Sequence, residues 1–296
     1  MKVLNFGSLN IDYVYKVDHM VQKGETELST GRQIFAGGKG LNQAVALGRA
    51  GLPTYHAGSI GRDGYFLLDM LKEAGVDVSF VQVLDDTPTG HTIIQNDKDG
   101  DNCILLLGGA NRAITREQVD KTIAAFEAGD FLVLQNEINH LAYIMEKAHE
   151  KGMKIVLNPS PMDETIAALP LEYIDYFFVN EVEASQLTGA SRDDENALLA
   201  GLMRKFPGAR VILTLGTRGS VYTDGETTVH ADICKVKTVD TTAAGDTFSG
   251  FFLAGVIRGM EPAEALRLAA RASSITVSRP GAAPSIPTME EVKALM

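Results

Sequence analysis

Short apolar runs alternate with amphipathic segments along most of the chain. Runs such as KVLNFGS (2–8), DFLVLQ (130–135) and DYFFVN (175–180) are nearly continuous in apolar residues, as expected of strands buried on both faces of a parallel sheet. Helical periodicity between such runs predicts covering helices. Further strands are expected at 54–61, 154–158 and 209–216, and helices at 40–51, 64–76, 140–152, 181–189, 196–206 and 246–259. The pattern predicts an α/β protein with a parallel sheet covered by helices on both faces, and 296 residues suit one large domain or two modest ones.

Two segments, 10–37 and 89–109, break this alternation and have the pattern of β-hairpins. The second contains Asp-Lys-Asp-Gly-Asp (97–101) between alternating runs, which is a strong turn signal. Both are inserted between α/β units, so they are expected to form a small β-sheet over the mouth of the large one. Such a lid would suit an enzyme that must exclude water. A hairpin elaboration without function is the alternative.

The composition narrows the classes of partner. The 296 residues are 45% hydrophobic and 22% charged, with a formal net charge of −11 and no cluster of Lys and Arg. A nucleic acid or an anionic membrane is therefore not an expected partner. The two cysteines, Cys103 and Cys234, have no metal-type spacing, which favours a reducing cytoplasm. The N-terminus turns polar after six residues, unlike a signal peptide, and no run reaches the length of a membrane span.

Three Gly-rich turns, at 36–44, 215–221 and 243–248, are candidates for ligand binding. None matches GxxxxGK[ST], and none matches GxGxxG, so the two common nucleotide fingerprints are absent. A nicotinamide-dependent enzyme is accordingly disfavoured.

The stretch DTTAAGDTFSGFF (240–252) carries the most specific chemistry. Ala243, Ala244 and Gly245 are small and precede a predicted helix, so their backbone N–H groups are expected to form an anion site at its N-terminus. Asp246 alone would be read as a helix N-cap. A carboxylate beside a bound phosphate would repel it, unless its role is to take a proton from a hydroxyl that attacks that phosphate. The stretch therefore indicates phosphoryl transfer, with Asp246 as the base.

A second group of polar residues suits a small polyol. Asn10 and Asp12 follow the first strand at i, i+2, and Lys39 and Asn42 lie around a helix start. Sugar hydroxyls can donate to Asp and accept from Asn or Lys.

The pairing of GGKGLNQA (37–44) with DTTAAGDTFSGFF resembles the two signatures of the ribokinase-like (PfkB) carbohydrate kinases. The resemblance extends along the whole chain, through GSLNID (7–12), LQNE (134–137), LNPSP (157–161), VNEVEASQLTG (179–189), LTLGTRGSV (213–221) and SRPGAAPSIP (278–287). It implies the ribokinase-like fold: a single α/β domain over 1–296 with a doubly wound, mostly parallel sheet, helices on both faces and a β lid from segments 10–37 and 89–109. It also implies ATP-dependent phosphorylation of a primary hydroxyl, with D-ribose as the expected acceptor and ribose 5-phosphate as product. Another pentose, a ketohexose or a nucleoside such as pseudouridine remain alternatives, as does a catalytically silent regulator that binds sugar or nucleotide.

The resemblance also implies roles for individual residues, position by position. The sugar would contact Asn10, Asp12, Gly38, Lys39, Asn42, Glu137 and Asp246. The transferring phosphate would be held at Ala243, Ala244 and Gly245, and the nucleotide would contact Asn180, Thr214, Gly216, Gly219, Ala244 and Gly245. Mg²⁺ would be organised by Asn180 and Glu183, and a monovalent cation, K⁺ in many relatives, by Asp240, Thr242, Thr276, Arg279, Gly281 and Ser285. A homodimer formed through the lid is expected.

Overall fold

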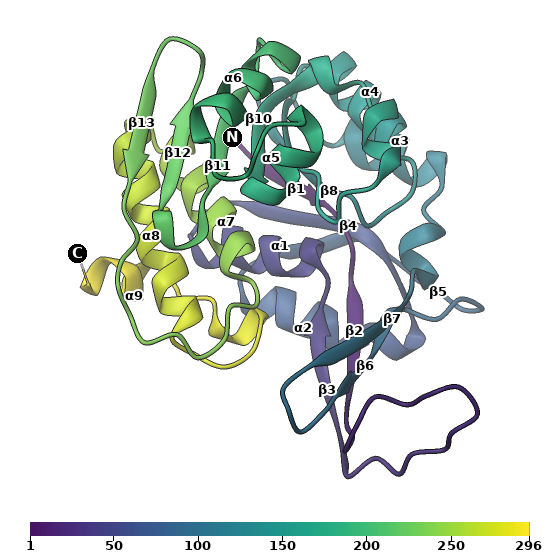
Figure 1. The fold of residues 1–296 in the computed structure, drawn as a ribbon. Helices are drawn as coiled ribbons and strands as arrows, with labels where there is room; N and C mark the ends of the chain where they lie inside the picture. The colour runs from purple at the N-terminus through teal and green to yellow at the C-terminus, as the bar shows by residue number, and fades with distance from the viewer. Residues whose placement is uncertain (296) are drawn as a thin grey trace.

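A nine-stranded sheet forms the centre of the molecule in the computed structural model, which describes residues 1–295 (Figure 1). The strand order is β13-β12-β11-β10-β9-β8-β1-β4-β5, and all pairings are parallel except β11 with β12 and β12 with β13. The strands are β1 (Val3–Phe6), β4 (Thr54–Gly61), β5 (Asp77–Leu84), β8 (Phe131–Gln135), β9 (Lys154–Asn158), β10 (Ile174–Asn180), β11 (Arg210–Thr214), β12 (Ser220–Thr223) and β13 (Thr228–Ala231). The doubly wound, mostly parallel sheet expected from the sequence is confirmed.

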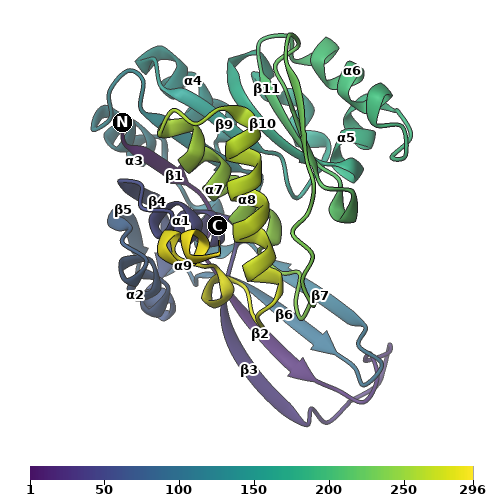
Figure 2. The same ribbon diagram turned by 90° about the vertical axis from the view of Figure 1, so that its left-hand side faces the viewer.

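Helices cover both faces of this sheet because neighbouring strand residues point in opposite directions. In β1, Val3 joins one hydrophobic core and Leu4 joins the other. The helices on the Val3 face are α1 (Lys39–Arg49), α2 (Tyr65–Glu73), α7 (Ala244–Ile257), α8 (Pro262–Val277) and α9 (Met289–Ala294), and those on the Leu4 face are α3 (Arg116–Ala124), α4 (Leu141–Lys151), α5 (Glu181–Thr188) and α6 (Glu195–Lys205). Figure 2 shows the two helical layers with the sheet between them.

The order of the strands reverses beside β1, and this reversal determines where a ligand-binding site is expected. From β1 the chain adds β4 and β5 on one side, then returns to place β8 on the other. In open α/β sheets, ligands bind outside the carboxyl ends of strands at such a switch point. The segments that follow β1 and β8 carry Asn10 and Glu137.

A separate four-stranded sheet, hereafter the lid sheet, projects from the carboxyl-end side of the large sheet (Figures 1 and 2). It consists of β2 (Asn10–Lys16), β3 (Gly31–Gly37), β6 (Gly90–Asn96) and β7 (Asn102–Leu107), in the order β3-β2-β6-β7. The two segments predicted as hairpins therefore pair with each other, through a parallel β2–β6 contact.

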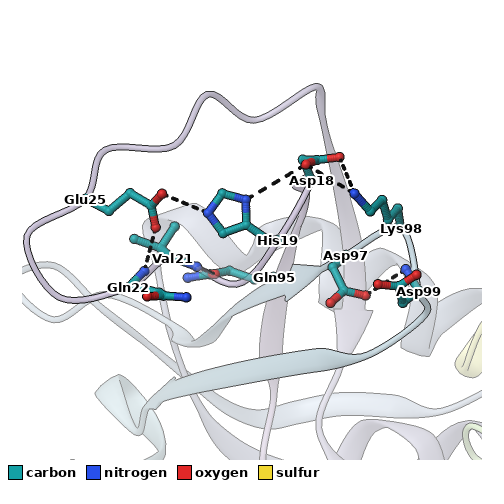
Figure 3. Close-up of polar contacts among 9 residues, drawn as sticks. All are labelled: Asp18, His19, Val21, Gln22, Glu25, Gln95, Asp97, Lys98 and Asp99. Atoms are coloured by element: carbon teal, nitrogen blue, oxygen red, sulfur yellow. Dashed lines mark hydrogen bonds and ion pairs between the residues drawn. The ribbon is translucent and has the colours of Figure 1, made fainter.

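The connection between β2 and β3 is held at the tip of the lid sheet by polar contacts (Figure 3). His19 Nε2 lies 2.8 Å from Glu25 Oε1, and Lys98 Nζ donates to Asp18 Oδ1 at 3.2 Å. The hydrogen bond to Glu25 raises the pKa of His19 above its usual value. The imidazolium–carboxylate form of this contact is therefore present between the lowered pKa of Glu25 and the raised pKa of His19, and it is lost as pH rises through the latter.

Among residues 1–295, no helix combines the length and the apolar character needed to cross a bilayer.

Candidate active site

A polar cavity of about 250 Å³ opens where the carboxyl ends of the central strands meet the N-terminus of α7. Lys39 and Asp246 lie on its wall with Thr214. The remaining lining residues are Asn158, Ser160, Phe178, Val179, Asn180, Glu183, Thr241, Ala243, Ala244, Gly245 and Ser249. One cavity thus collects the expected base, the expected anion site and residues expected to contact nucleotide and metal.

Asp246 lies in the first turn of α7 and is only 7% exposed. Asn42 Nδ2 donates to its Oδ2 at 3.2 Å, and Gln43 Nε2 donates to its Oδ1 at 2.9 Å. Both donors belong to α1, which packs against α7 in the same core. The carboxylate is held on both oxygens by neutral amides, so it is oriented while each oxygen keeps a lone pair for a hydroxyl proton.

The turn before α7 presents backbone donors to the cavity. Ala243 has φ 61° and is one of two non-glycine residues with positive φ among residues 1–295, and no side chain in that range caps the helix. Such strain commonly occurs at functional sites. The N–H groups of Ala243, Gly245 and Asp246 have no acceptor among the described residues.

The structure differs from the sequence expectation at Ala244. Its N–H donates to the carbonyl of Thr241 at 3.2 Å, which closes the turn. Two of the three amides assigned to the anion site, those of Ala243 and Gly245, are therefore available, and the N–H of Asp246 is a further donor that the sequence analysis did not assign.

Two of the residues expected to bind a polyol lie at the base of the lid sheet, and the other two, Lys39 and Asn42, lie on α1. Asn10 and Asp12 are on β2, opposite Gly37 and Phe35 of β3. A Cβ on Gly37 would lie 2.0 Å from Asp12 Oδ2, so only glycine leaves room for this carboxylate. Burial, the larger effect, raises the pKa of Asp12, while the hydroxyl of Thr92 opposes the rise by donating to its Oδ1 at 2.6 Å.

Asn111 holds the side chain of Asn10 by a hydrogen bond, and the sequence analysis missed this contact. Its Oδ1 accepts the N–H of Leu9 at 3.0 Å, and its Nδ2 donates to Asn10 Oδ1 at 2.7 Å. The amide of Asn10 is thereby oriented with its Nδ2 left for a ligand. Asn111 stands in the stretch GANR (109–112), and nothing in the local spacing of that stretch indicates a contact 101 residues away.

Glu137 is brought to the start of α1. Its Oε2 accepts the N–H of Lys39 at 2.8 Å and the hydroxyl of Ser8. Burial, the dominant effect, raises the pKa of Glu137, and these hydrogen bonds oppose the rise. Gly38, which precedes Lys39, has φ 94° and lies against the backbone of Ser8. The structure thus brings Glu137, Lys39 and Gly38 together.

Asn180 and Glu183 form the N-terminal capping box of α5. Asn180 Oδ1 accepts the N–H of Glu183 at 2.9 Å, and Glu183 Oε2 accepts the N–H of Asn180 at 3.1 Å. Both residues line the cavity, and Glu183 is buried with its second oxygen outside the capping box. A carboxylate oxygen and waters are ligands that Mg²⁺ accepts, so these residues fit the expected metal.

Gly216 and Gly219 flank the turn after β11, both with positive φ. A Cβ on Gly219 would lie 2.2 Å from the carbonyl oxygen of Ala231, so a larger residue at this position would clash with the backbone. Thr214, at the end of β11, faces the cavity.

The segments assigned to a monovalent cation lie side by side. Val239 and Asp240 donate their N–H groups to the carbonyl of Val277, and Gly281 donates to Asp240 Oδ2 at 3.0 Å. Burial tends to raise the pKa of Asp240, but hydrogen bonds from Thr242 and Gly281 together hold it below its usual value. The hydroxyls of Thr276 and Ser285 donate to carbonyls of their own turns, at 3.3 and 2.7 Å, and Arg279 pairs with Glu291.

A buried carboxylate beside uncapped amide donors, with the polar side chains of Asn10 and Asp12 at the lid sheet, is the arrangement expected of a phosphotransferase with an alcohol group as acceptor. The model of the pfkB family carbohydrate kinases matches residues 1–289. The chain belongs to this family.

Ribokinases are prominent among the similar proteins. The chain is 36% identical to the ribokinase of Staphylococcus aureus over 302 residues, which cover 98% of each protein. The crystal structure of ribokinase from Cryptococcus neoformans in complex with ADP matches with a TM-score of 0.90 and 32% identity, over 100% of this chain and 99% of that one. The structure of Arabidopsis thaliana ribokinase complexed with ribose and ATP matches with a TM-score of 0.88 and 30% identity, over 99% and 97% of the two chains.

Proposed function

We propose that this protein transfers the γ-phosphoryl group of ATP to the primary hydroxyl of D-ribose and forms ribose 5-phosphate. The observation that carries the proposal is the position of Asp246: it is buried, held by two amides, and adjacent to backbone N–H groups that have no protein acceptor among residues 1–295. The ribokinases that resemble this chain, one of them solved with ribose and ATP, support the choice of acceptor and donor.

In the proposed reaction, Asn10, Asp12 and Asn42 hold the sugar hydroxyls. Asn42 Oδ1 is buried without a partner in the described chain and is a ready acceptor for a hydroxyl. The hydroxyl proton passes to Asp246 as its oxygen bonds to the γ-phosphorus, and the bond from that phosphorus to the leaving ADP oxygen breaks. The N–H groups of Ala243 and Gly245 stabilise the charge on the transferring group.

The nucleotide is proposed to bind along Thr214, Gly216 and Gly219, with its phosphates toward α7. Asn180 and Glu183 would hold Mg²⁺ through water, and the bound metal would offset charge on the phosphates. Asp240 and carbonyls of the 276–285 segment would hold K⁺, next to the turn that carries the anion donors. The contacts of Asp240 with Val277 and Gly281 support this last assignment, because they keep the two segments together.

An assay of ADP release with a panel of acceptors tests the function. With ATP and Mg²⁺, D-ribose is expected to give a kcat/KM at least about 100-fold above those of other pentoses, fructose and pseudouridine, because a site built for particular hydroxyls discriminates strongly. Replacement of KCl by choline chloride is expected to lower the rate, and NMR of the product should place the phosphate on the primary carbon. ADP release no faster than without acceptor, for every sugar, would refute the proposal.

We also propose that the lid sheet mediates a homodimer. The edge strand β7 exposes a run of apolar side chains, Ile104, Leu105, Leu106 and Leu107, each 49–67% exposed. An exposed apolar edge strand is a surface that proteins normally cover.

The double variant Leu105→Lys/Leu107→Lys is expected to convert a dimer into a monomer in size-exclusion chromatography with light scattering, because buried lysines would oppose the contact. Leu28→Lys is the matched control, since Leu28 is 87% exposed in the loop between β2 and β3. A monomeric unmodified protein at micromolar concentration would contradict the dimer.

A further inference from the structure

A row of buried polar side chains leads from the interior of the large sheet to Asp246. It begins at His56 on β4 and passes through Asn5 on β1, Gln135 on β8 and Gln43 on α1. His56, Asn5 and Gln135 are 0% exposed and Gln43 is 1% exposed. We call Asn5, Gln135 and Gln43 the amide network. Polar side chains are costly in a core, and a row of them calls for a reason beyond packing.

Gln135 is the central donor of the amide network. Gln135 Nε2 donates to Asn5 Oδ1 at 2.9 Å and also to Gln43 Oε1 at 2.6 Å. Gln43 therefore presents its Nε2 to Asp246 Oδ1, at 2.9 Å. If the amide of Gln43 turned over, two oxygens would face each other at the carboxylate and two NH₂ groups would face each other at Gln135.

The orientation of the amide network is fixed at Asn5, because the side-chain amide of Asn5 cannot turn over. Asn5 Nδ2 donates to the backbone carbonyl of Gly40 at 2.5 Å, and a carbonyl only accepts. Asn5 Nδ2 also lies 3.3 Å from His56 Nδ1. Burial lowers the pKa of His56 to about 3, so the ring is neutral. Because the Nδ2 of Asn5 only donates, this contact requires the tautomer in which Nδ1 of His56 accepts. Asn5 Oδ1 must then face Gln135.

Gln135 keeps its orientation at a cost. Its Oε1 is buried without a hydrogen-bond partner among residues 1–295 and occupies the space that a Cβ on Gly7 would need, at 2.3 Å. An unpaired buried acceptor costs about 1–3 kcal/mol. The glycine and the unpaired oxygen are both explained if the two N–H groups of Gln135 are required at Asn5 and Gln43.

We propose that the amide network fixes the donor of Gln43 toward Asp246, and that Gln135, which touches neither Asp246 nor the cavity, is a positioning residue for the base. The inference rests on the proposed role of Asp246 in proton abstraction. It assigns to the interior of the sheet a part in orienting the carboxylate at the reaction centre.

Gln135→Glu tests this because it keeps the shape of the side chain and reverses its polarity. A carboxylate at 135 accepts only, so Gln43 is expected to turn its NH₂ toward it and its oxygen toward Asp246. We expect kcat to fall about 10- to 100-fold, as for a misplaced catalytic group, while KM for ATP changes less than about twofold. Gln118→Glu is the matched control: Gln118 is a 3% exposed glutamine whose Nε2 donates to the carbonyl of Gly58, and it has no contact with the amide network.

The Gln43→Met background separates positioning from general damage. If Gln135 acts through Gln43, adding Gln135→Glu to Gln43→Met lowers kcat by less than about twofold. If Gln135→Glu does not fold, Gln135→Met takes its place. This change removes the hydrogen bond to Gln43 without reversing the orientation of the Gln43 amide. Gln135→Met alone should lower kcat, whereas adding it to Gln43→Met should not. A kcat within twofold of wild type for Gln135→Glu, or the same loss with and without Gln43, would overturn the proposal.

A measurement without turnover distinguishes this proposal from the proposed function. The side-chain NH₂ signal of Gln43 in ¹H–¹⁵N spectra, assigned by its loss in Gln43→Met, should shift in Gln135→Glu and stay in place in Gln118→Glu. An inactive wild-type protein that shows this shift would refute the kinase assignment alone. An active protein without the shift would refute the amide network alone.

Discussion

Asp246→Asn is expected to lower kcat by about 10²- to 10⁴-fold, the usual contribution of a positioned general base. The change removes the proton acceptor and keeps the shape of the side chain. One of the two amides that face position 246 must then turn, and Asn42 is free to do so because its Oδ1 has no partner in the described chain. The fold and the cavity should therefore persist, and the dissociation constant of a non-hydrolysable ATP analogue should change less than about twofold.

Steady-state ADP release and calorimetric titration with the ATP analogue measure these two quantities. Asp130→Asn is the matched control, because Asp130 is also 7% exposed and both of its oxygens accept backbone N–H groups, from Lys2 and Glu127. The control should keep its kcat even if it loses stability. Turnover by Asp246→Asn within tenfold of wild type would remove Asp246 from the role of base.

Gly245→Ala is expected to separate activity from stability. A Cβ on Gly245 would meet nothing within 4 Å, its φ is not in the left-handed region, and the residue lines the cavity. The fold therefore tolerates the methyl group, and alanine in place of glycine in a helix favours folding by about 0.5–1 kcal/mol. The methyl group would occupy space beside the amide donors, so kcat/KM is expected to fall about 10- to 100-fold through loss of contact with the transferring phosphoryl group.

Measurements of the Tm and of the rate of ADP release on the same preparation test whether Gly245→Ala keeps its stability while it loses activity. Gly208→Ala is the control, since a Cβ there also meets nothing within 4 Å and the residue lies in the turn before β11, outside the cavity lining. Both variants should have a Tm equal to that of wild type or higher by about 1–3 °C. An active Gly245→Ala protein would mean that phosphate does not approach this turn closely.

The sequence predicted the large sheet wherever local pattern is sufficient. The strands β4 and β9 have the predicted bounds, and α1 and α7 begin within two residues of theirs, because continuous apolar runs and a 3.6-residue period depend on neighbours alone. It did not predict β5, an edge strand with alternating exposure, or the antiparallel pair β12 and β13. Edge strands are half solvated, so their apolar content is lower and their signal weaker. The assignment of 1–296 to one domain stays a prediction.

The sequence analysis proposed candidate site residues only where they belong to local motifs. Asp246, Asn42 and Lys39 each stand in a motif, and the structure brings them to one region. The supporting amides were not predicted, because Gln43 and Gln135 meet across 92 residues and Asn111 and Asn10 across 101. Contacts of that kind depend on which strands are adjacent, and no local period encodes adjacency.

The strand β2 begins at Asn10 and Asp12, which are proposed to bind the sugar, and continues into the lid sheet, so both residues belong to the same strand as the lid. A rotation of the lid sheet would therefore move the Asp12 carboxylate together with the sheet. Acceptor binding and closure of the lid sheet would then depend on one and the same movement. Release of the phosphorylated product would begin with the reverse movement, because that movement also weakens product binding. A spectroscopic label on β3 or β6 should accordingly report acceptor binding directly, without any signal from the nucleotide.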